Sequence, residues 1–343
     1  MKEQIKVNFI TGASGHIGNV LVRKLIDRGQ KVRTLILPGE DCTSLEELDI
    51  ERVEGDVLDL DCLRQAMQGA QNVYHLAGLI SIMPGKNELV QRVNVEGTRN
   101  ILKACRETGV KRLVYTSSIH AFYRAPHGVT IDEKIPFDPE HAISAYDRSK
   151  AEASLEVLEA ARNGLDAVIA CPTGVIGPYD FRGSEMGHVI RDAMDESKAQ
   201  FCVEGAYDFV DVRDVAEGLI LACERGRSGE SYILSGERLS YTQILQTVKR
   251  FTGTGLRMLY IPLKLARFAA IFAPLYYRIT RTKPRLTPYA LATVASNSVI
   301  SNAKARRELG YAPRQLSQTI ADTVKWFREY PFNRLAPVRI RNK

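Results

Sequence analysis

Apolar residues along the first half of the chain follow two alternating patterns. Short continuous runs of β-branched, aliphatic and aromatic residues predict buried strands. Apolar residues that recur at helical spacing between these runs predict helices, several of which end at a glycine. The strands are predicted at 6–11, 32–37, 52–57, 73–77, 112–116 and 167–171, and the helices at 19–28, 60–68, 88–108 and 145–162. Repeated strand–helix units predict an α/β fold, a doubly wound parallel sheet of the Rossmann type with helices on both faces.

The pattern of predicted elements changes after Pro172. Shorter strands and helices follow, and prolines separate them. We expect a smaller C-terminal lobe, which binds the substrate and lies over the carboxyl edge of the sheet, where such sheets bind their ligands. The main domain is expected over 1–175 with a return around 206–235, the lobe over 176–205 and 236–335, and a basic tail over 336–343.

Composition narrows the class of protein. The chain has 343 residues, 45% hydrophobic and 25% charged, as in an ordinary globular protein. Its net charge of +7 comes from scattered Lys and Arg, so we expect no nucleic-acid partner. Six cysteines without C-x-x-C spacing argue against a disulfide framework and a metal site, and favour a reducing, cytoplasmic compartment. Neither a secretory signal nor an apolar stretch long enough to span a bilayer is visible.

A glycine-rich loop joins the first predicted strand to the first predicted helix. Gly12 would allow the tight turn, Gly15 would let the backbone approach a pyrophosphate, and Gly18 would let the helix pack closely on the strand. The helix N-terminus would offer free N–H groups to the phosphates. A tight structural turn is the alternative interpretation. The candidate cofactor-binding residues of the loop are Gly12, Ser14, Gly15, His16, Ile17 and Gly18.

Three side chains at the same sheet edge suggest proton transfer. Tyr146 and Lys150 stand four residues apart on a predicted helix, hence on one face. A free tyrosine has a pKa of about 10, and a nearby ammonium is expected to lower it, so that Tyr146 exchanges a proton with an alkoxide or alcohol. Lys150 can also hold the nicotinamide ribose. A hydroxyl from Ser117 or Ser118, at the end of the fifth strand, would bind the substrate oxygen.

The G-x-x-G-x-x-G spacing, followed in order by Ser118, Tyr146 and Lys150, resembles the extended short-chain dehydrogenase/reductase family, part of the NAD-dependent epimerase/dehydratase superfamily. The resemblance covers nearly the whole chain. It implies an NAD(P) cofactor, a homodimer, Ser118 as the catalytic serine and Asn94 as a supporting residue. Further cofactor-binding residues implied by it are Asp56, Val57, Ala77, Gly78, Tyr146, Lys150, Pro172 and Val175.

Two polar residues at predicted strand ends, Asp56 and His75, allow a purely structural interpretation. Asp56 would lie near the adenine ring by the family pattern, but it can equally be a polar residue that ends the third strand and caps the next turn of the chain. His75, at the end of the fourth strand, is interpreted as a structural residue and not as a catalyst.

The choice between NAD and NADP stays open in the sequence. An acidic residue at the end of the second strand binds the ribose 2′-hydroxyl, and an arginine there accepts a 2′-phosphate. Relatives often carry aspartate where Ile36 stands or arginine where Leu37 stands, and both are absent. Arg33 is a candidate for the phosphate, or a solvated strand residue, while Glu40 and Asp41 lie slightly further on.

The substrate is suggested by departures from the nucleotide-sugar enzymes of the same family. Cys171 and Gly174 replace the arginine and asparagine of their R-x-x-N-x-x-G-P motif. The resemblance is greater to the dihydroflavonol-reductase and 3β-hydroxysteroid-dehydrogenase branch. We therefore expect an NAD(P)-dependent oxidoreductase that interconverts a ketone and a secondary alcohol on a bulky, largely apolar small molecule, steroid-, flavonoid- or lipid-like. The alternatives are a nucleotide-sugar epimerase/dehydratase with tightly bound NAD, and a non-catalytic NAD(P)-sensing protein.

The segment 261–288 allows three interpretations. Its centre, 268–277, is uncharged and apolar, and basic residues flank it on both sides. It is too short to span a bilayer, but such a segment can rest in the interface of an anionic membrane. The other two interpretations are a lid over an apolar pocket and a packing contact with the lobe or with a second subunit.

Overall fold

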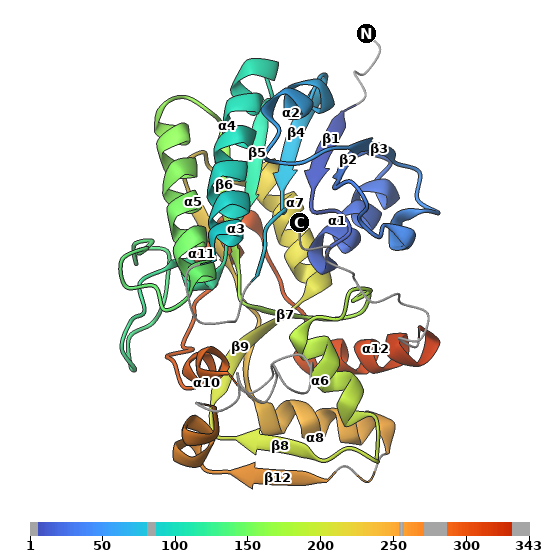
Figure 1. The fold of residues 1–343 in the computed structure, drawn as a ribbon, viewed down its shortest axis with the longest axis vertical. Coiled ribbons are helices and arrows are strands. Elements are labelled where there is room, and N and C mark those ends of the chain that lie inside the picture. The colour runs from blue at the N-terminus through green and yellow to red at the C-terminus, as the bar shows by residue number, and fades with distance from the viewer. Residues whose placement is uncertain (1–5, 81–86, 254, 256, 271–286, 331–343) are drawn as a thin grey trace.

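The computed structural model describes residues 6–80, 87–253, 255, 257–270 and 287–330. Its main sheet has seven strands in the order β10-β6-β5-β4-β1-β2-β3, and every neighbouring pair is parallel (Figure 1). This confirms the predicted doubly wound α/β sheet. The strands are β1 (Val7–Thr11), β2 (Lys31–Ile36), β3 (Glu51–Glu54), β4 (Ala70–His75), β5 (Arg112–Thr116), β6 (Ala167–Pro172) and β10 (Ser231–Leu234).

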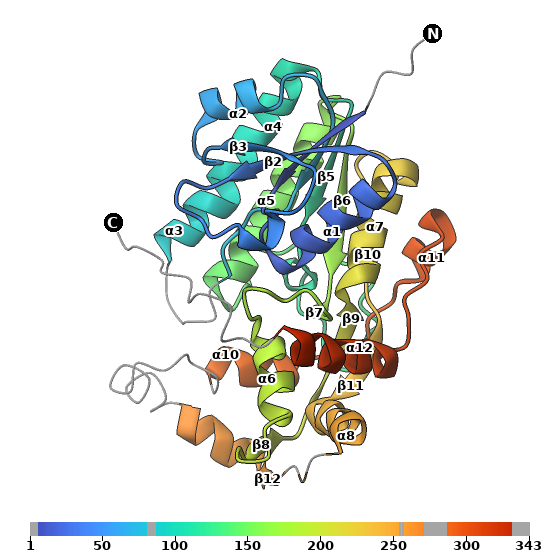
Figure 2. The same ribbon diagram turned by 90° about the vertical axis from the view of Figure 1, so that its right-hand side faces the viewer.

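Helices cover both faces of this sheet because successive strand residues point to opposite faces. Phe9 and Leu113 belong to a core cluster on one face, whereas their neighbours Ile10 and Val114 belong to a separate cluster on the other. The first face carries α2 (Leu60–Ala66), α4 (Gly97–Thr108) and α5 (Ala145–Arg162), and the second carries α1 (His16–Asp27), α7 (Val212–Arg225) and α11 (Ala303–Leu309) (Figure 2).

The remaining elements gather at the end of the sheet toward which its strands point (Figure 1). A three-stranded sheet comprises β7 (Gly174–Ile176), β9 (Ala206–Asp211) and β11 (Glu237–Ser240). A two-stranded sheet comprises β8 (Gln200–Val203) and β12 (Met258–Ile261). The accompanying helices are α6 (Glu185–Ala193), α8 (Tyr241–Thr252), α10 (Pro288–Val294) and α12 (Leu316–Glu329).

A buried carboxyl group joins these elements to the main sheet. Asp208 Oδ1, on β9, accepts hydrogen bonds from Thr173 Oγ1 at 2.6 Å and from the Gly236 N–H at 3.0 Å. Thr173 directly follows β6, and Gly236 follows β10. Burial raises the pKa of Asp208 to about 6, although both hydrogen bonds oppose the shift. Asp208 therefore ties β9 to the carboxyl edge of the main sheet, and its burial lowers the free energy of unfolding by an amount that depends on pH.

This cost predicts how Asp208→Asn affects stability. As pH rises from about 4 to about 6, Asp208 ionises in the unfolded chain before it does so in the folded one, and folding stability falls by about 2 kcal/mol. Asparagine can accept both hydrogen bonds and does not ionise. Urea denaturation should show the variant gaining about 2 kcal/mol relative to the wild type between pH 4 and pH 7. An unchanged difference at the two pH values would contradict the assignment.

Candidate active site

The glycine loop has the close contacts that its sequence predicts. Gly12 has a φ of +73°, and a Cβ there would lie 2.7 Å from the Ala77 nitrogen. A Cβ on Gly18 would lie 2.2 Å from the Gly12 carbonyl oxygen. These two positions can therefore hold only glycine without a backbone shift.

The start of α1 fits a pyrophosphate. Gly15 is the N-cap, no side chain caps it, and the first turn holds no acidic residue. A Cβ on Gly15 would meet a single described atom within 4 Å, the Gly12 carbonyl oxygen at 3.3 Å. The first N–H groups of the helix and the space beside them can accordingly receive an anion.

The other loop side chains tie this site to its surroundings. Ser14 Oγ donates to Glu40 Oε1 at 2.6 Å, and His16 Nε2 lies 2.9 Å from the Pro178 carbonyl oxygen. Ile17 packs against the core cluster that α1 covers. Of the loop residues, Ser14 and His16 therefore connect the main sheet to the segments that lie beyond its carboxyl edge.

His75 is neutral and structural, as the sequence predicts. Its Nδ1 lies 2.7 Å from Thr11 Oγ1, and its Nε2 lies 3.0 Å from Thr98 Oγ1. Burial lowers the pKa of His75 to about 3. Thr11 Oγ1 in turn accepts the Ala77 N–H at 3.1 Å, so this cluster fixes the end of β4 against the glycine loop.

Asn94 holds the next part of the site. Its amide donates to the Leu79 carbonyl at 3.0 Å and to Ser149 Oγ at 2.8 Å, and its Oδ1 accepts the Leu79 N–H at 2.8 Å. The predicted helix over 88–108 is present, and a π-helical turn (Arg92–Glu96) lies within it, between α3 (Glu88–Gln91) and α4. A Cβ on Gly78 would lie 3.1 Å from Asn94 Oδ1 and 3.5 Å from Lys150 Nζ.

The structure brings Ser118, Tyr146 and Lys150 together. Ser118 lies just beyond the end of β5, as the N-cap residue of η3 (Ile119–Ala121). Its hydroxyl lies close enough to Tyr146, on α5, to influence the pKa of the phenol. Lys150 Nζ donates to the Thr116 carbonyl at 2.7 Å. Ser117 Oγ instead lies 2.6 Å from Ser154 Oγ in a buried contact, which favours Ser118 of the two candidate serines.

The expected lowering of the Tyr146 pKa is wrong in this structure. Burial raises the pKa of Tyr146 to about 12, although the nearby Ser118 hydroxyl opposes the shift. Burial also lowers the pKa of Lys150 to about 8. The physical reason is that desolvation outweighs the lysine charge, whose ammonium donates to the Thr116 carbonyl.

The structure does not bring Arg33 to the glycine loop. Its guanidinium pairs with Glu51 at 2.7 Å and donates to the carbonyls of Ala66 at 2.9 Å and Gln68 at 2.7 Å. The prediction that Arg33 reaches the cofactor is therefore wrong, because Arg33 lies before the end of β2 and three acceptors hold its side chain there.

Four other candidates lie at strand ends. Asp56 Oδ1 accepts the Leu58 N–H at 3.0 Å, which matches the capping interpretation, and the buried Val57 comes next in the chain. Pro172 is the last residue of β6, and Val175 lies on β7, where the main sheet passes into the smaller sheet. Their positions are compatible with the cofactor roles that the family pattern implies.

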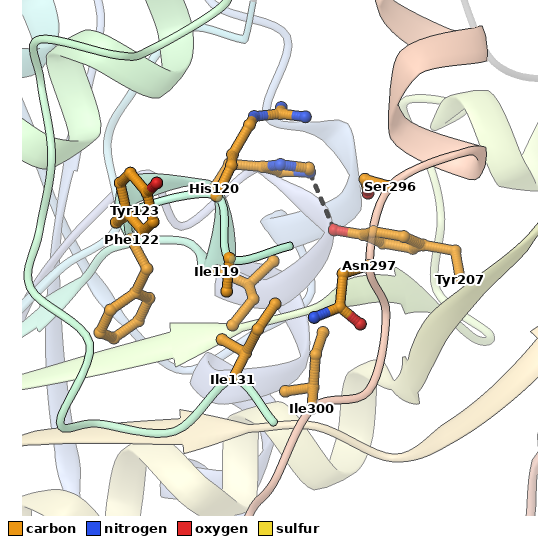
Figure 3. A pocket seen from close by; sticks show the side chains of 11 residues that line it. Ile119, His120, Phe122, Tyr123, Ile131, Tyr207, Ser296, Asn297 and Ile300 are labelled. Atoms are coloured by element: carbon orange, nitrogen blue, oxygen red, sulfur yellow. Dashed lines mark hydrogen bonds between the residues drawn. The ribbon is translucent and has the colours of Figure 1, made fainter. Parts of the chain in front are cut away.

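A pocket of about 40 Å³ opens directly after Ser118, and its lining is not indicated by any motif of the sequence (Figure 3). His120 Nε2 lies 2.8 Å from Tyr207 Oη, and the two rings stack 5.7 Å apart. Figure 3 shows Ile119, Ile131 and Ile300 beside this pair. The lining residues are Ile119, His120, Phe122, Tyr123, Arg124, Ala125, Ile131, Tyr207, Ser296, Asn297 and Ile300.

A second group without a sequence motif surrounds the start of α5. The side chain of Asp147, next to Tyr146, is fully buried. It accepts hydrogen bonds from Arg124 Nη2 at 2.9 Å and from Tyr289 Oη at 2.8 Å. Asp147 thus connects α5 to the loop after β5 and to α10.

Two kinds of feature are missing from the part of the chain that the structure describes. No group of His, Cys, Asp or Glu among the described residues is arranged to hold a metal ion. No described helix is both long enough and apolar enough to cross a membrane.

Known proteins match most of this chain. Residues 8–235 match the model of the NAD dependent epimerase/dehydratase family. Sterol demethylase protein B of Methylococcus capsulatus is 38% identical, over 93% of this chain and 98% of its own. A putative dihydroflavonol 4-reductase of Synechocystis is 35% identical, over 94% and 95%. The solved structure of gox2253 superimposes with a TM-score of 0.83 at 34% identity, over 95% of this chain and 99% of its own. The chain therefore belongs to the NAD-dependent epimerase/dehydratase family and is an NAD(P)-dependent enzyme of the extended short-chain dehydrogenase/reductase type.

Proposed function

We propose that this enzyme interconverts a ketone and a secondary alcohol on a bulky, largely apolar, polycyclic substrate. The observation that carries the proposal is the proximity of the Ser118 hydroxyl to the Tyr146 phenol, beside a pocket with a largely aromatic and aliphatic lining. A protein that only sensed the dinucleotide would not need a proton donor at this place.

The proposed chemistry assigns one role to each residue. A bound nicotinamide dinucleotide supplies or accepts the hydride. Ser118 and Tyr146 bind the substrate oxygen, and Tyr146 gives its proton to the alkoxide that forms during reduction. With a pKa of about 12, Tyr146 carries this proton at neutral pH. Lys150, whose pKa is about 8, remains mostly charged at neutral pH and can hold the nicotinamide ribose next to Gly78.

The substrate class rests on the pocket and on the relatives. The lining of the pocket, which includes Ile119, Phe122 and Ile131, is compatible with an apolar ligand, but the cavity of about 40 Å³ must widen to admit a fused-ring molecule. The names of two relatives refer to a sterol and to a dihydroflavonol, which are both fused-ring molecules. Together these features favour a flat polycyclic substrate.

The nucleotide-sugar alternative has less support at Gly174. Nucleotide-sugar enzymes usually carry an asparagine at this position. Here a Cβ would lie 2.8 Å from Phe209 Cδ1 and 3.1 Å from the Asp208 carbonyl oxygen. An asparagine side chain would not fit at position 174 without movement of β9. The contact that this asparagine makes with the nucleotide in those enzymes therefore has no counterpart here.

A substrate screen tests the proposal. We expect fused-ring 3-hydroxysteroids or flavanonols to change the absorbance of the reduced nicotinamide when supplied with the appropriate cofactor. We also expect UDP- and GDP-sugars not to raise the melting temperature, because only ligands of the native state stabilise it. A saturable shift with a sugar nucleotide and no reaction with any polycyclic substrate would contradict the proposal.

Tyr146→Phe tests the proton donor. The variant loses only a hydroxyl group, so it should fold and bind the dinucleotide as the wild type does. Its turnover on a substrate found in the screen should fall by about 100- to 10,000-fold, the usual contribution of general acid–base catalysis. Tyr330→Phe, on the half-exposed end of α12, is the matched control and should keep full turnover. Equal turnover of Tyr146→Phe and the wild type would refute the assignment.

We propose further that the segment 261–288 touches an anionic membrane. Its described part includes the helix 263–270, in which Leu265 and Phe268 are 58% and 61% exposed and lie beside the exposed Lys264 and Arg267. Residues 271–286 lie outside the described part of the chain. The homodimer, the cytoplasmic location and the lid stay predictions.

Vesicle flotation at low salt tests the membrane contact. The wild type should float with vesicles that contain phosphatidylserine, and Lys264→Glu/Arg267→Glu should float less because its charge is reversed beside the apolar side chains. Lys325→Glu/Arg328→Glu makes the same change on the exposed side of α12 and should float like the wild type. Recovery of all three proteins in the soluble fraction would exclude the contact.

A further inference from the structure

A half-buried arginine beside the pocket has a hydrogen-bond donor that no described residue accepts. Arg124 lies in the loop after β5 and lines the pocket that opens after Ser118. Its Nη2 donates to Asp147 Oδ2 at 2.9 Å. Its Nε–H is buried and has no hydrogen-bond partner in the described part of the chain. A buried donor without an acceptor destabilises the folded protein, so this arrangement points to an acceptor that a ligand supplies.

Asp147 fixes the position of the guanidinium. Its side chain is fully buried, and Tyr289 Oη donates to its other oxygen, Oδ1, at 2.8 Å. Each carboxylate oxygen of Asp147 therefore has its own donor. Arginine and carboxylate groups often meet as a bidentate fork, but Arg124 meets Asp147 through a single nitrogen. The Nε side of the guanidinium is thus left for a second acceptor.

The pocket next to Arg124 has the size of a small polar group. Its volume of about 40 Å³ gives room for about three water-sized groups, enough for a keto or carboxyl group but not for the rings that carry it. Other polar side chains of the lining are engaged: His120 Nε2 lies 2.8 Å from Tyr207 Oη (Figure 3), and Asn297 Nδ2 donates to backbone carbonyls at 3.0 Å and 2.6 Å. Of the described lining residues, Arg124 contributes the buried side-chain donor that lacks a partner.

This donor is connected to both residues of the proposed proton transfer. Arg124 follows Ser118 in the same loop, and its partner Asp147 comes directly after Tyr146. The backbone N–H of His120, which lines the same pocket, donates to Ser118 Oγ at 3.2 Å. A substrate whose reacting oxygen meets Ser118 and Tyr146 can therefore place a neighbouring polar group against Arg124.

We propose that Arg124 is a specificity-determining residue that binds a second oxygen of the substrate, in a carbonyl or carboxyl group near the reacting carbon. Asp147 is its positioning residue. The inference rests on the proposed function, because the second oxygen belongs to the substrate of that reaction. It makes the substrate class more specific, from a bulky ketone or alcohol to one that carries two oxygen functions. Lysine cannot replace Arg124, since its single ammonium group lacks the planar set of donors.

Side-chain NMR tests the donor without any turnover. The Arg124 Nε–H signal, assigned by its absence from Arg124→Lys, would be followed in the NAD⁺-loaded enzyme during titration with sodium acetate and, separately, with acetamide, a neutral molecule of similar size. We expect a saturable shift: with both probes it indicates a carbonyl oxygen, and with acetate alone a carboxylate. Asp147→Asn removes the competing negative charge, so acetate should bind about tenfold more tightly and acetamide equally well.

Arg112 provides the matched control. Its Nε already donates to Asp166 Oδ2 at 3.0 Å, so its signal should not move. Sodium chloride at the same concentration should move neither signal. No shift of the Arg124 signal with either probe, or an equal shift at Arg112, would overturn the inference.

Steady-state kinetics connect the donor to the substrate. On a fused-ring substrate with the second oxygen, Arg124→Lys should raise KM about tenfold and leave kcat within about twofold. On the matched compound without that oxygen, KM should stay the same. Equal effects on the two compounds would contradict the role of Arg124 and leave the proposed function intact. Acetate binding by an enzyme that converts no fused-ring ketone or alcohol would instead refute the proposed function, and with it the assignment of this site to the substrate.

Discussion

The site depends on the close packing of the glycine loop against the end of β4. Gly12 lies so near Ala77 that no side chain fits between them, and Gly18 lies equally near the Gly12 carbonyl. This packing leaves the first turn of α1 uncapped and open to an anion. Gly78, close by, lies next to Lys150, so that the proposed phosphate site and the proposed proton-transfer site share one edge of the sheet.

Burial determines the protonation states of Tyr146 and Lys150 at that edge. The pKa of Tyr146 rises and that of Lys150 falls, because removal of water disfavours the charged form of each. Tyr146 therefore retains its proton at neutral pH, a state suited to the reduction of a ketone. The sequence shows that Tyr146 and Lys150 share a helix face, but it does not show how much water the fold removes.

Local patterns predicted much of this structure. Six of the seven strands of the main sheet, the glycine loop and the Ser118–Tyr146–Lys150 group follow from short-range spacing, and the family pattern favoured Ser118 over Ser117. The strand β10 was not predicted. The contacts of Asn94 could not be predicted in this way. An apolar pattern of helical spacing does not reveal the π-helical turn that contains Asn94, nor the hydrogen bonds of its side chain with Leu79 and Ser149.

Other features depend on contacts between distant segments. Glu40 meets Arg182, and His120 meets Tyr207, in each case across a large separation in sequence. The prediction for Arg33 failed for the same reason. Arg33 lies on the expected strand, but Glu51 and backbone carbonyls hold its guanidinium away from the glycine loop, and the residues next to Arg33 in the sequence do not indicate these contacts. Pairings of this kind appear only when the chain is folded.

Transfer of an isotopic label tests the central claim most directly. NADH that carries deuterium at the transferable position of its nicotinamide ring would be incubated with the enzyme and a polycyclic ketone, and the product would be examined by mass spectrometry. Hydride transfer to the substrate predicts one deuterium on the new carbinol carbon. A product without deuterium there, with the label retained in the dinucleotide, would contradict this mechanism.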